Sequence, residues 1–220
     1  MTAAPPVSVA EAIREAFSAA SLPLSDRQAR AFTAHAELML RWNRTHNLTR
    51  IVEPVEIARR HFLDSAAVLD HVDAPSGALT ADIGSGAGFP GLAVAAYRPD
   101  LRVRLFESSS KKASFLMAAL PAVGSGNVQV EHTRLTIGAS IADGGAYDLI
   151  LSRYTSPLEW LGRLSRRMLK SGGWLAAHKF DDADEREALA RFPAEFGARI
   201  VEWRSDARLD ARRRFALAQF

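Results

Sequence analysis

The chain has 220 residues, of which 48% are hydrophobic and 24% are charged, and its net charge is +3. These values predict a globular protein, and the absence of cysteine excludes disulfides and thiolate chemistry. No apolar run approaches the roughly 18 residues that span a bilayer, and residues 1–8 lack the pattern of a secretory signal. We therefore expect a cytoplasmic protein that does not enter a membrane.

The first third of the chain is predicted to be helical. Amphipathic spacing indicates one helix over 9–20 and a second over about 25–42, which Ser25 and Asp26 can cap. The polar residues 43–47 interrupt this pattern. Pro54 suits the first turn of a third helix that continues to about residue 69.

Basic residues are concentrated in three parts of the chain. Between residues 27 and 61, seven arginines stand against three glutamates. A second cluster contains Arg163, Arg166 and Arg167, and a third lies in 204–214. Such stripes fit a polyanionic partner, and they equally fit solvated helix faces that are rich in arginine.

From residue 78 onward, short apolar runs alternate with helical patterns. Strands are expected at 78–83, 101–106, 127–132, 147–152, 173–179, 199–204 and 213–219. Helices are expected at 90–97, 110–122, 157–170 and 183–194. This alternation predicts an α/β, doubly wound and mostly parallel sheet, with the last two strands forming an antiparallel edge. We expect a helical domain at 1–75 and a sheet domain at 76–220.

A glycine-rich run, Asp82-Ile-Gly-Ser-Gly-Ala-Gly-Phe-Pro-Gly91, follows the first expected strand. Glycine allows tight turns and close approach to a ligand, and the helix behind the run is expected to offer unpaired N–H groups. Ligands of doubly wound sheets bind outside the carboxyl ends of the strands. The run therefore predicts a site for a nucleotide-like ligand.

The identity of that ligand depends on the register of the glycines. Gly84, Gly86 and Gly88 form a GxGxG loop directly at the strand end, which is typical of S-adenosylmethionine sites. A later GxGxxG register, which ends at Gly91, is the signature of dinucleotide sites, so a NAD-binding oxidoreductase is an alternative. Glu107 ends the second strand, where a carboxylate can accept the ribose hydroxyls of an adenosine and disfavours a 2′-phosphate.

Two motifs together make the chain resemble a known family, the bacterial small-subunit rRNA guanine-N7 methyltransferases. One is the glycine run, and the other is His61-Phe-Leu-Asp-Ser65, preceded by Arg60. Further matching residues, such as Lys111-Lys112 and Ser152-Arg153, follow in the same order over roughly residues 40–180.

The resemblance implies a class I, Rossmann-like methyltransferase fold with a helical N-terminal cap. It implies S-adenosylmethionine as the methyl donor and N7 of a guanine in 16S rRNA, free or in the small subunit, as the acceptor. Together with the loop, it predicts the following cofactor contacts: Asp82, Gly84, Gly86, Gly88, Phe89, Glu107, Ser108, Leu135, Thr136 and Arg153.

The chain departs from this family at three places. The family usually has glutamate where Thr136 stands and alanine where Tyr154 stands, and residues 177–180 replace a leucine-lysine-glycine ending. Tyr154 and Phe180 are expected to flank the pocket of the target base. A non-catalytic, RNA-binding relative is therefore a further alternative.

Methylation of guanine N7 needs no general base, because this nitrogen carries a lone pair and no proton. We therefore predict that the protein has no catalytic acid or base and acts by proximity and alignment of the reactants. We also expect no metal, and we expect a monomer. An aromatic face, Tyr154 or Phe89, can favour the cationic product. The residues expected to contact RNA are Arg60, His61, Ser65, Tyr154, Arg163, Arg167 and Lys179. For His61, Ser65 and the neighbouring Asp64, a buried network that joins the cap to the sheet is the alternative. For Lys179, the alternative is a solvated side chain.

Overall fold

The computed structural model describes residues 7–138, 140–141 and 144–220. Residues 1–6, with which the expected helical domain begins, lie outside this description. The helical segments are α1 (Val9–Ala19), α2 (Asp26–His46), α3 (Pro54–Ile57), η1 (Ala58–Leu63), α4 (Asp64–Ala67), η2 (Val68–His71), α5 (Gly91–Tyr97), α6 (Ser110–Val123), α7 (Leu158–Met168), α8 (Ala183–Ala190) and α9 (Phe192–Phe196). The strands are β1 (Leu79–Ile83), β2 (Arg102–Glu107), β3 (Val128–His132), β4 (Tyr147–Arg153), β5 (Leu169–Phe180), β6 (Ile200–Arg204) and β7 (Arg213–Gln219).

The described strands form one sheet in the order β3-β2-β1-β4-β5-β7-β6. Strands β1 to β5 pair in parallel, whereas β7 runs antiparallel to both β5 and β6. The predicted doubly wound, mostly parallel sheet is confirmed, and so is the antiparallel pairing of the last two strands. The strand that runs against the others is β7, which lies one place inside the edge strand β6.

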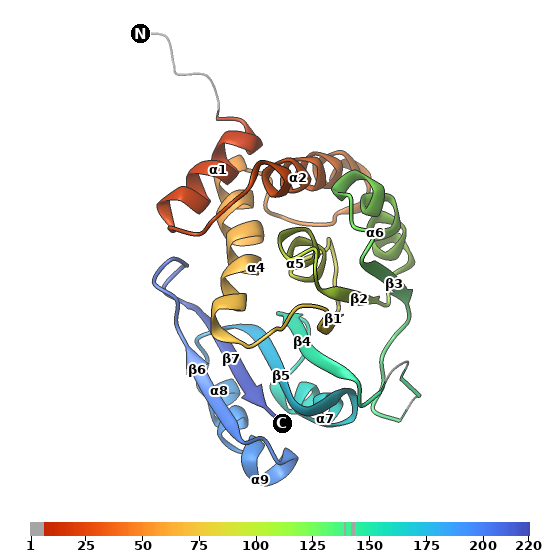
Figure 1. Ribbon diagram of the computed structural model, residues 1–220, viewed down its shortest axis with the longest axis vertical. Coiled ribbons are helices and arrows are strands. Elements are labelled where there is room, and N and C mark those ends of the chain that lie inside the picture. The colour runs from red at the N-terminus through yellow and green to blue at the C-terminus, as the bar shows by residue number, and fades with distance from the viewer. Residues whose placement is uncertain (1–6, 139, 142–143) are drawn as a thin grey trace.

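Helices cover both faces of this sheet (Figure 1). On one face, α5, α6 and the N-terminal helices share a core with the strands, in which Phe32 and Phe62 pack with Leu105 and Leu149. On the other face, α7, α8 and α9 pack against a second core. Burial on both faces explains why β1 is buried along its whole length, its polar Thr80 and Asp82 included.

The N-terminal helices begin where the sequence predicts. Ser8 caps α1 together with Glu11, and Ser25 caps α2 together with Gln28, each pair forming a capping box. The second helix ends four residues later than predicted, because residues 43–46 continue it and Asn47 ends it in the left-handed region, at φ 48°. The polar residues that were predicted to break this helix form its last turn instead.

The third predicted helix is one continuous helical stretch over residues 54–71. Its second segment, η1, is a π-helix that contains Arg60 and His61. Such segments are rare and occur frequently at functional sites. In Figure 1 this stretch is labelled by its α4 segment, and the Arg60 carbonyl of η1 accepts hydrogen bonds from Arg153 at the end of β4 and from Arg213 at the start of β7.

Strand β5 begins earlier than predicted. Residues 169 and 170 were assigned to the preceding helix, but α7 ends at Met168 and β5 starts directly at Leu169. The early part of the strand turns at Gly172, where φ is +81°, and the register with β4 shifts between Tyr147 and Leu149. The expected strand at 173–179 is therefore the regular second part of a longer strand.

The topology gathers the polar ends of the strands at one edge of the sheet. Because β1, β2, β4 and β5 are parallel, the glycine loop after Ile83, Glu107, Arg153 and Phe180 all lie at their carboxyl ends. In the antiparallel strand β7, Arg213 pairs with Phe180 and joins the same edge.

The shared core makes a prediction about stability. Phe62 is fully buried, with its ring centroid 4.6 Å from that of Phe32. We expect Phe62→Ala to lower the free energy of unfolding by about 3–5 kcal/mol. Helix content and tryptophan fluorescence should still report one common urea transition, whereas Val55→Ala, at a half-exposed position, should change little. Two separate transitions, with only one shifted, would contradict a shared core.

Candidate functional site

The glycine loop turns through three residues in the left-handed region, Gly84, Gly86 and Gly88, with φ values of 74°, 58° and 89°. A Cβ on Gly84 would lie 2.7 Å from Thr155, and one on Gly88 would lie 2.9 Å from Leu92. A Cβ on Gly86 would meet only the Gly84 carbonyl, at 3.9 Å. Packing therefore fixes the two outer glycines, while the space beside Gly86 is open.

Two buried carboxylates hold the loop in this shape. Asp82 Oδ2 accepts a hydrogen bond of 3.0 Å from the Gly91 N–H, and burial raises the pKa of Asp82 to about 6. Glu107 Oε2 accepts one of 2.8 Å from the Gly86 N–H, and its Oε1 accepts one of 2.7 Å from the Ser109 N–H. Asp82 thereby joins the end of the loop to β1, and Glu107 joins the middle of the loop to β2.

The expected unpaired N–H groups at the start of α5 are not present, so this prediction is wrong. Asp82 binds the first N–H group of the helix, and loop carbonyls bind those of Leu92, Ala93 and Val94. The N–H groups of residues 84–86, 88 and 89 also have partners within the loop or on β2. A dinucleotide loop binds pyrophosphate through free N–H groups, so this geometry argues against the GxGxxG interpretation.

A pocket of about 660 Å³ opens at the carboxyl ends of β1 and β2, within the size range of small-molecule sites. Of the predicted cofactor contacts, it brings together Gly84, Glu107, Ser108, Leu135 and Thr136. The pocket is also lined by residues that were not predicted as contacts, namely Ile83, Phe106, Lys112, Thr133, Arg134, Ile137, Thr155, Ser156, Pro157 and Trp160. The position of Thr155 just beyond the end of β4 is the signal that could have identified it.

The remaining predicted cofactor contacts lie around the pocket rather than in its wall. Asp82 is buried beneath the loop. Phe89 is only 3% exposed, and its ring stacks on the imidazoles of His35 and His61, with centroids 4.6 and 4.3 Å apart. Phe89 thus joins the loop to the N-terminal helices.

His35 is a supporting residue that the sequence analysis did not single out. It lies on α2, and its Nε2 is 2.7 Å from the Ala87 carbonyl. Since a carbonyl only accepts, the proton is on Nε2. Burial lowers the pKa of His35 to about 4, so the imidazole is neutral at pH 7.

Arg153 connects the end of β4 to η1. Its Nη1 donates to the Arg60 carbonyl at 2.9 Å, and its Nη2 lies 3.2 Å from His61 Nδ1. Arginine can only donate, so His61 accepts at Nδ1 and donates from Nε2 to Thr49 Oγ1 at 3.1 Å. Burial and the charge of Arg153 hold the pKa of His61 well below its usual value.

Asp64 is fully buried beside this network. Its Oδ2 lies 2.5 Å from Arg213 Nη1 and 3.6 Å from Arg153 Nη1, although neither of its oxygens receives a well-directed hydrogen bond. Ser65 is also buried and donates to the His61 carbonyl. His61, Asp64 and Ser65 therefore lie in the buried network that was the alternative to RNA contact.

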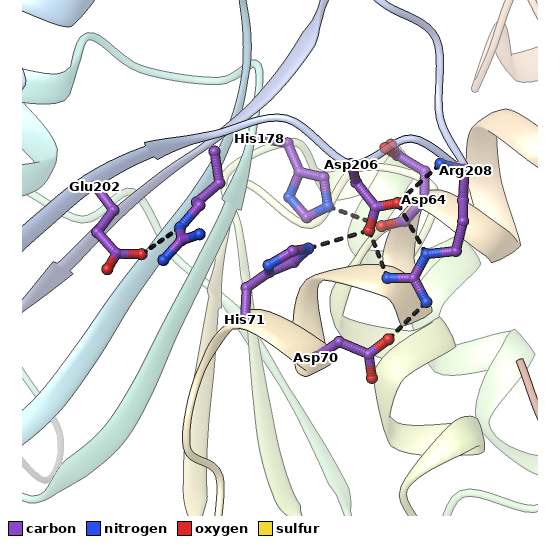
Figure 2. Close-up of polar contacts among 8 residues, drawn as sticks. Asp64, Asp70, His71, His178, Glu202, Asp206 and Arg208 are labelled. Carbon is purple, nitrogen blue, oxygen red and sulfur yellow. Dashed lines mark hydrogen bonds and ion pairs between the residues drawn. The ribbon is translucent and has the colours of Figure 1, made fainter.

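Figure 2 shows how the chain between β6 and β7 is attached to the third helix. Arg208 lies between Asp206 and Asp70, with its Nη1 2.6 Å from Asp70 Oδ2. His71 Nε2 lies 3.0 Å from Asp206 Oδ2, and His178 Nε2 donates to the backbone carbonyl of Asp64 at 3.1 Å. The contacts of Arg208 and Asp206 fix the chain before β7 against η2, and Arg213 at the start of β7 donates to the Arg60 carbonyl of η1 at 3.3 Å.

Lys179 was predicted to contact the target or to be solvated, and the structure buries it. It is 6% exposed, and its Nζ donates to the Ser156 carbonyl and to Glu185, both at 2.6 Å. Glu185 in turn accepts the Leu158 N–H at 3.0 Å. Lys179 thus fixes the segment 156–158 that lines the pocket.

The other residues predicted to contact RNA are more exposed. Arg60 on η1 pairs with Glu56 at 2.6 Å, and Arg163 on α7 pairs with Glu159 at 2.7 Å. Arg167 is exposed near the end of α7, away from the carboxyl edge where this helix begins. Tyr154 is 37% exposed beside Arg153 at the carboxyl edge.

Within the described residues, no group of His, Asp and Glu is placed to hold a metal ion. Among the same residues, no helix is long and apolar enough to cross a bilayer.

Comparisons with known proteins identify the relatives of this site. The family model described as rRNA small subunit methyltransferase G matches residues 28–199. A curated protein of that name from Desulforamulus reducens is 34% identical over 79% of this chain and 72% of its own length, and one from Stenotrophomonas maltophilia is 36% identical over 89% and 88%. A solved methyltransferase structure from Aquifex aeolicus aligns with a TM-score of 0.61 at 17% identity, over 79% of this chain and 96% of that chain.

The buried imidazole of His35 predicts a dependence of stability on pH. Its pKa is about 4 in the folded protein and 6.5 ordinarily. Between these values only the unfolded chain takes up the proton, so the free energy of unfolding falls by up to about 1.4 kcal/mol per pH unit on acidification. Asp82 acts in the opposite sense between pH 3.8 and 6, because its pKa is raised and the folded state holds the extra proton.

The His35→Gln variant separates these two effects, since glutamine keeps a donor for the Ala87 carbonyl. Urea unfolding at pH 7 and at pH 5 should show a smaller loss of stability in His35→Gln than in the wild type. His132→Gln, at an exposed position, serves as the control. Equal losses in the wild type and His35→Gln would show that His35 is not a buried neutral imidazole.

Proposed function

The chain belongs to the rRNA small subunit methyltransferase G family, and from this membership we propose that it methylates N7 of a guanine in 16S rRNA. Membership confirms the resemblance that the two sequence motifs predicted. The protein is an rRNA methyltransferase, and its methyl donor is S-adenosylmethionine. Neither the NAD-linked oxidoreductase nor the non-catalytic relative is favoured.

The loop and its pocket support this choice of cofactor. S-adenosylmethionine supplies an electrophilic methyl group carried on a sulfonium. In the proposed arrangement, the open space beside Gly86 admits the cofactor, and Glu107 accepts hydrogen bonds from the ribose hydroxyls. Leu135 and Thr136 then line the side of the pocket that holds the adenine. One observation carries the proposal. The loop is bonded internally, the space beside Gly86 is open, and Glu107, which binds the Gly86 N–H, lines the pocket.

The proposed reaction requires alignment of the reactants and no proton transfer. Guanine N7 presents a lone pair and no proton, so no residue of the chain has to act as a base. The buried imidazoles of His35 and His61 are already committed to carbonyl and hydroxyl partners. The protein therefore contributes orientation and exclusion of water, which can account for large rate effects.

The proposed RNA surface lies on the helical side of the carboxyl edge. Here Arg60 presents a half-exposed guanidinium, and phosphates of the rRNA can neutralise the excess of arginines in 27–61. Arg163 and Arg167 are proposed as secondary contacts for a large substrate such as the small ribosomal subunit. In this proposal residues 1–75 form the RNA-contacting part and 76–220 hold the cofactor, in a cytoplasmic monomer that needs no metal.

The open space at Gly86 makes a direct prediction. In Gly86→Asp a side chain and a negative charge enter that space next to Glu107, at a φ of 58°, so binding of S-adenosylhomocysteine should be lost. Calorimetry measures this on a variant whose fold is checked by circular dichroism. Gly126→Asp is the control, because a Cβ there meets nothing within 4 Å. Unchanged affinity in a folded Gly86→Asp protein would contradict the loop assignment.

The proposed acceptor is tested by mapping 7-methylguanosine in 16S rRNA from cells with and without the gene. One modified guanine should disappear on deletion and return with the wild-type gene, but not with Gly86→Asp. Single-turnover rates in vitro should show no ionisation of a catalytic base near neutral pH. An unchanged 7-methylguanosine map would refute the proposed acceptor.

A further inference from the structure

Two aromatic side chains stack on each other at the surface where the substrate has to approach. Tyr154 follows β4 and Phe180 ends β5, with ring centroids 4.5 Å apart and planes 17° from parallel. Tyr154 is 37% exposed and Phe180 is 53% exposed. Aromatic side chains that together expose apolar surface at the edge of a site often mark a place where a ligand or partner binds.

The backbone at Tyr154 supports a binding role for its ring. Its φ is +54°, a conformation that bulky residues rarely adopt. The structure enforces it from both sides, since the Tyr154 N–H donates to the His178 carbonyl at 3.2 Å and Thr155 Oγ1 donates to the Ile83 carbonyl at 3.2 Å. Strain of this kind is found at binding sites, where it positions a side chain.

An arginine-lined pocket of about 220 Å³ adjoins the aromatic pair. Arg213 connects the two, because it lines the pocket, pairs in register with Phe180, and has its Cζ 5.9 Å from the centre of the Tyr154 ring. The lining residues are Glu56, Arg59, Arg60, Arg208, Leu209, Asp210 and Arg213.

One guanidinium in this pocket is available to an anion. Of the four arginines that line it, Arg208 is paired with Asp70 and Asp206, and Arg213 with Asp64. The side chain of Arg59, in contrast, is exposed and has no hydrogen bond or ion pair with any residue that the structure describes. Asp210 lies 3.8 Å from Arg60, a long contact that an incoming phosphate can replace. The size and the guanidinium groups fit one phosphate of a nucleic acid strand.

We infer that Tyr154 and Phe180 form an aromatic clamp, a stacked pair against whose exposed face the target guanine packs, and that the arginine pocket binds a phosphate of the same strand. The inference rests on the proposed function and adds the way in which the base is held. A base unstacked from RNA regains stacking on aromatic side chains. The clamp should also favour the product, because methylation at N7 makes the purine cationic and aromatic faces attract cations.

Free nucleotides test the clamp separately from methyl transfer. S-adenosylhomocysteine is added at saturation to fill the cofactor pocket, and three probes are titrated by calorimetry: guanosine, guanosine 5′-monophosphate and 7-methylguanosine 5′-monophosphate. We expect the methylated nucleotide to bind at least about threefold more tightly than the unmethylated one. The unmethylated nucleotide should in turn bind more tightly than guanosine.

Matched variants assign these differences to residues. Phe180→Ala should remove the preference for the methylated base and raise the KM for rRNA, while Phe180→Tyr restores both. Met117→Ala, at a residue that is also 53% exposed, is the control. Arg59→Gln should remove the advantage of the nucleotide over guanosine, whereas Arg102→Gln, at the opposite edge of the sheet, should not.

The outcomes distinguish the clamp from the proposed function. If none of the probes binds, or if Phe180→Ala matches Met117→Ala in both base preference and KM, the clamp is refuted even though the wild type methylates rRNA. If the probes bind as expected but the wild type leaves guanine N7 of 16S rRNA unmethylated, the proposed function fails and the nucleotide site stands.

Discussion

The site depends on two buried carboxylates that hold the backbone of one loop. Asp82 fixes the first N–H of α5, and Glu107 fixes the N–H of Gly86 while it also lines the pocket. Buried hydrogen bonds from N–H groups to carboxylates are strong, and an unpaired group in their place is costly. The loop therefore keeps its shape before any ligand arrives, with one open position at Gly86. A preformed loop of this kind lowers the entropy that binding would otherwise cost.

The N-terminal helices are part of this arrangement. His35 donates to the loop at Ala87, Phe89 stacks on two neutral imidazoles, and Arg153 carries the connection to η1. Because these groups are buried, the loop, the third helix and the end of β4 are positioned together. The exposed Tyr154 is the next residue after Arg153, so the same network that supports the cofactor side of the site also sets the place of the substrate. Methyl transfer by alignment alone requires this joint positioning.

Local patterns predicted the fold well, and long-range contacts account for what they missed. Periodicity and turn residues identified the strands, but they did not identify the last turn of α2 or the start of β5. The start of β5 depends on its pairing with β4, which the sequence of one strand does not show. The motif residues at 82–91 and 107 were identified, yet their roles depend on which atoms they face. Asp82 binds the first N–H of α5 and Lys179 binds Glu185, and neither pairing can be deduced from the spacing of residues in the sequence. His35 was missed because its partner lies 52 residues away in the chain.

The central claim is that this loop is built for S-adenosylmethionine and not for a dinucleotide. Calorimetric titration of the wild-type protein with S-adenosylhomocysteine, beside a fluorescence titration with NADH, tests it most directly. The account predicts saturable binding of S-adenosylhomocysteine and no response to NADH, because the N–H groups of residues 84–86, 88, 89 and 91 are already bonded within the protein and do not offer a set of free donors to a pyrophosphate. Binding of NADH, or no binding of S-adenosylhomocysteine at high micromolar concentration, would contradict it.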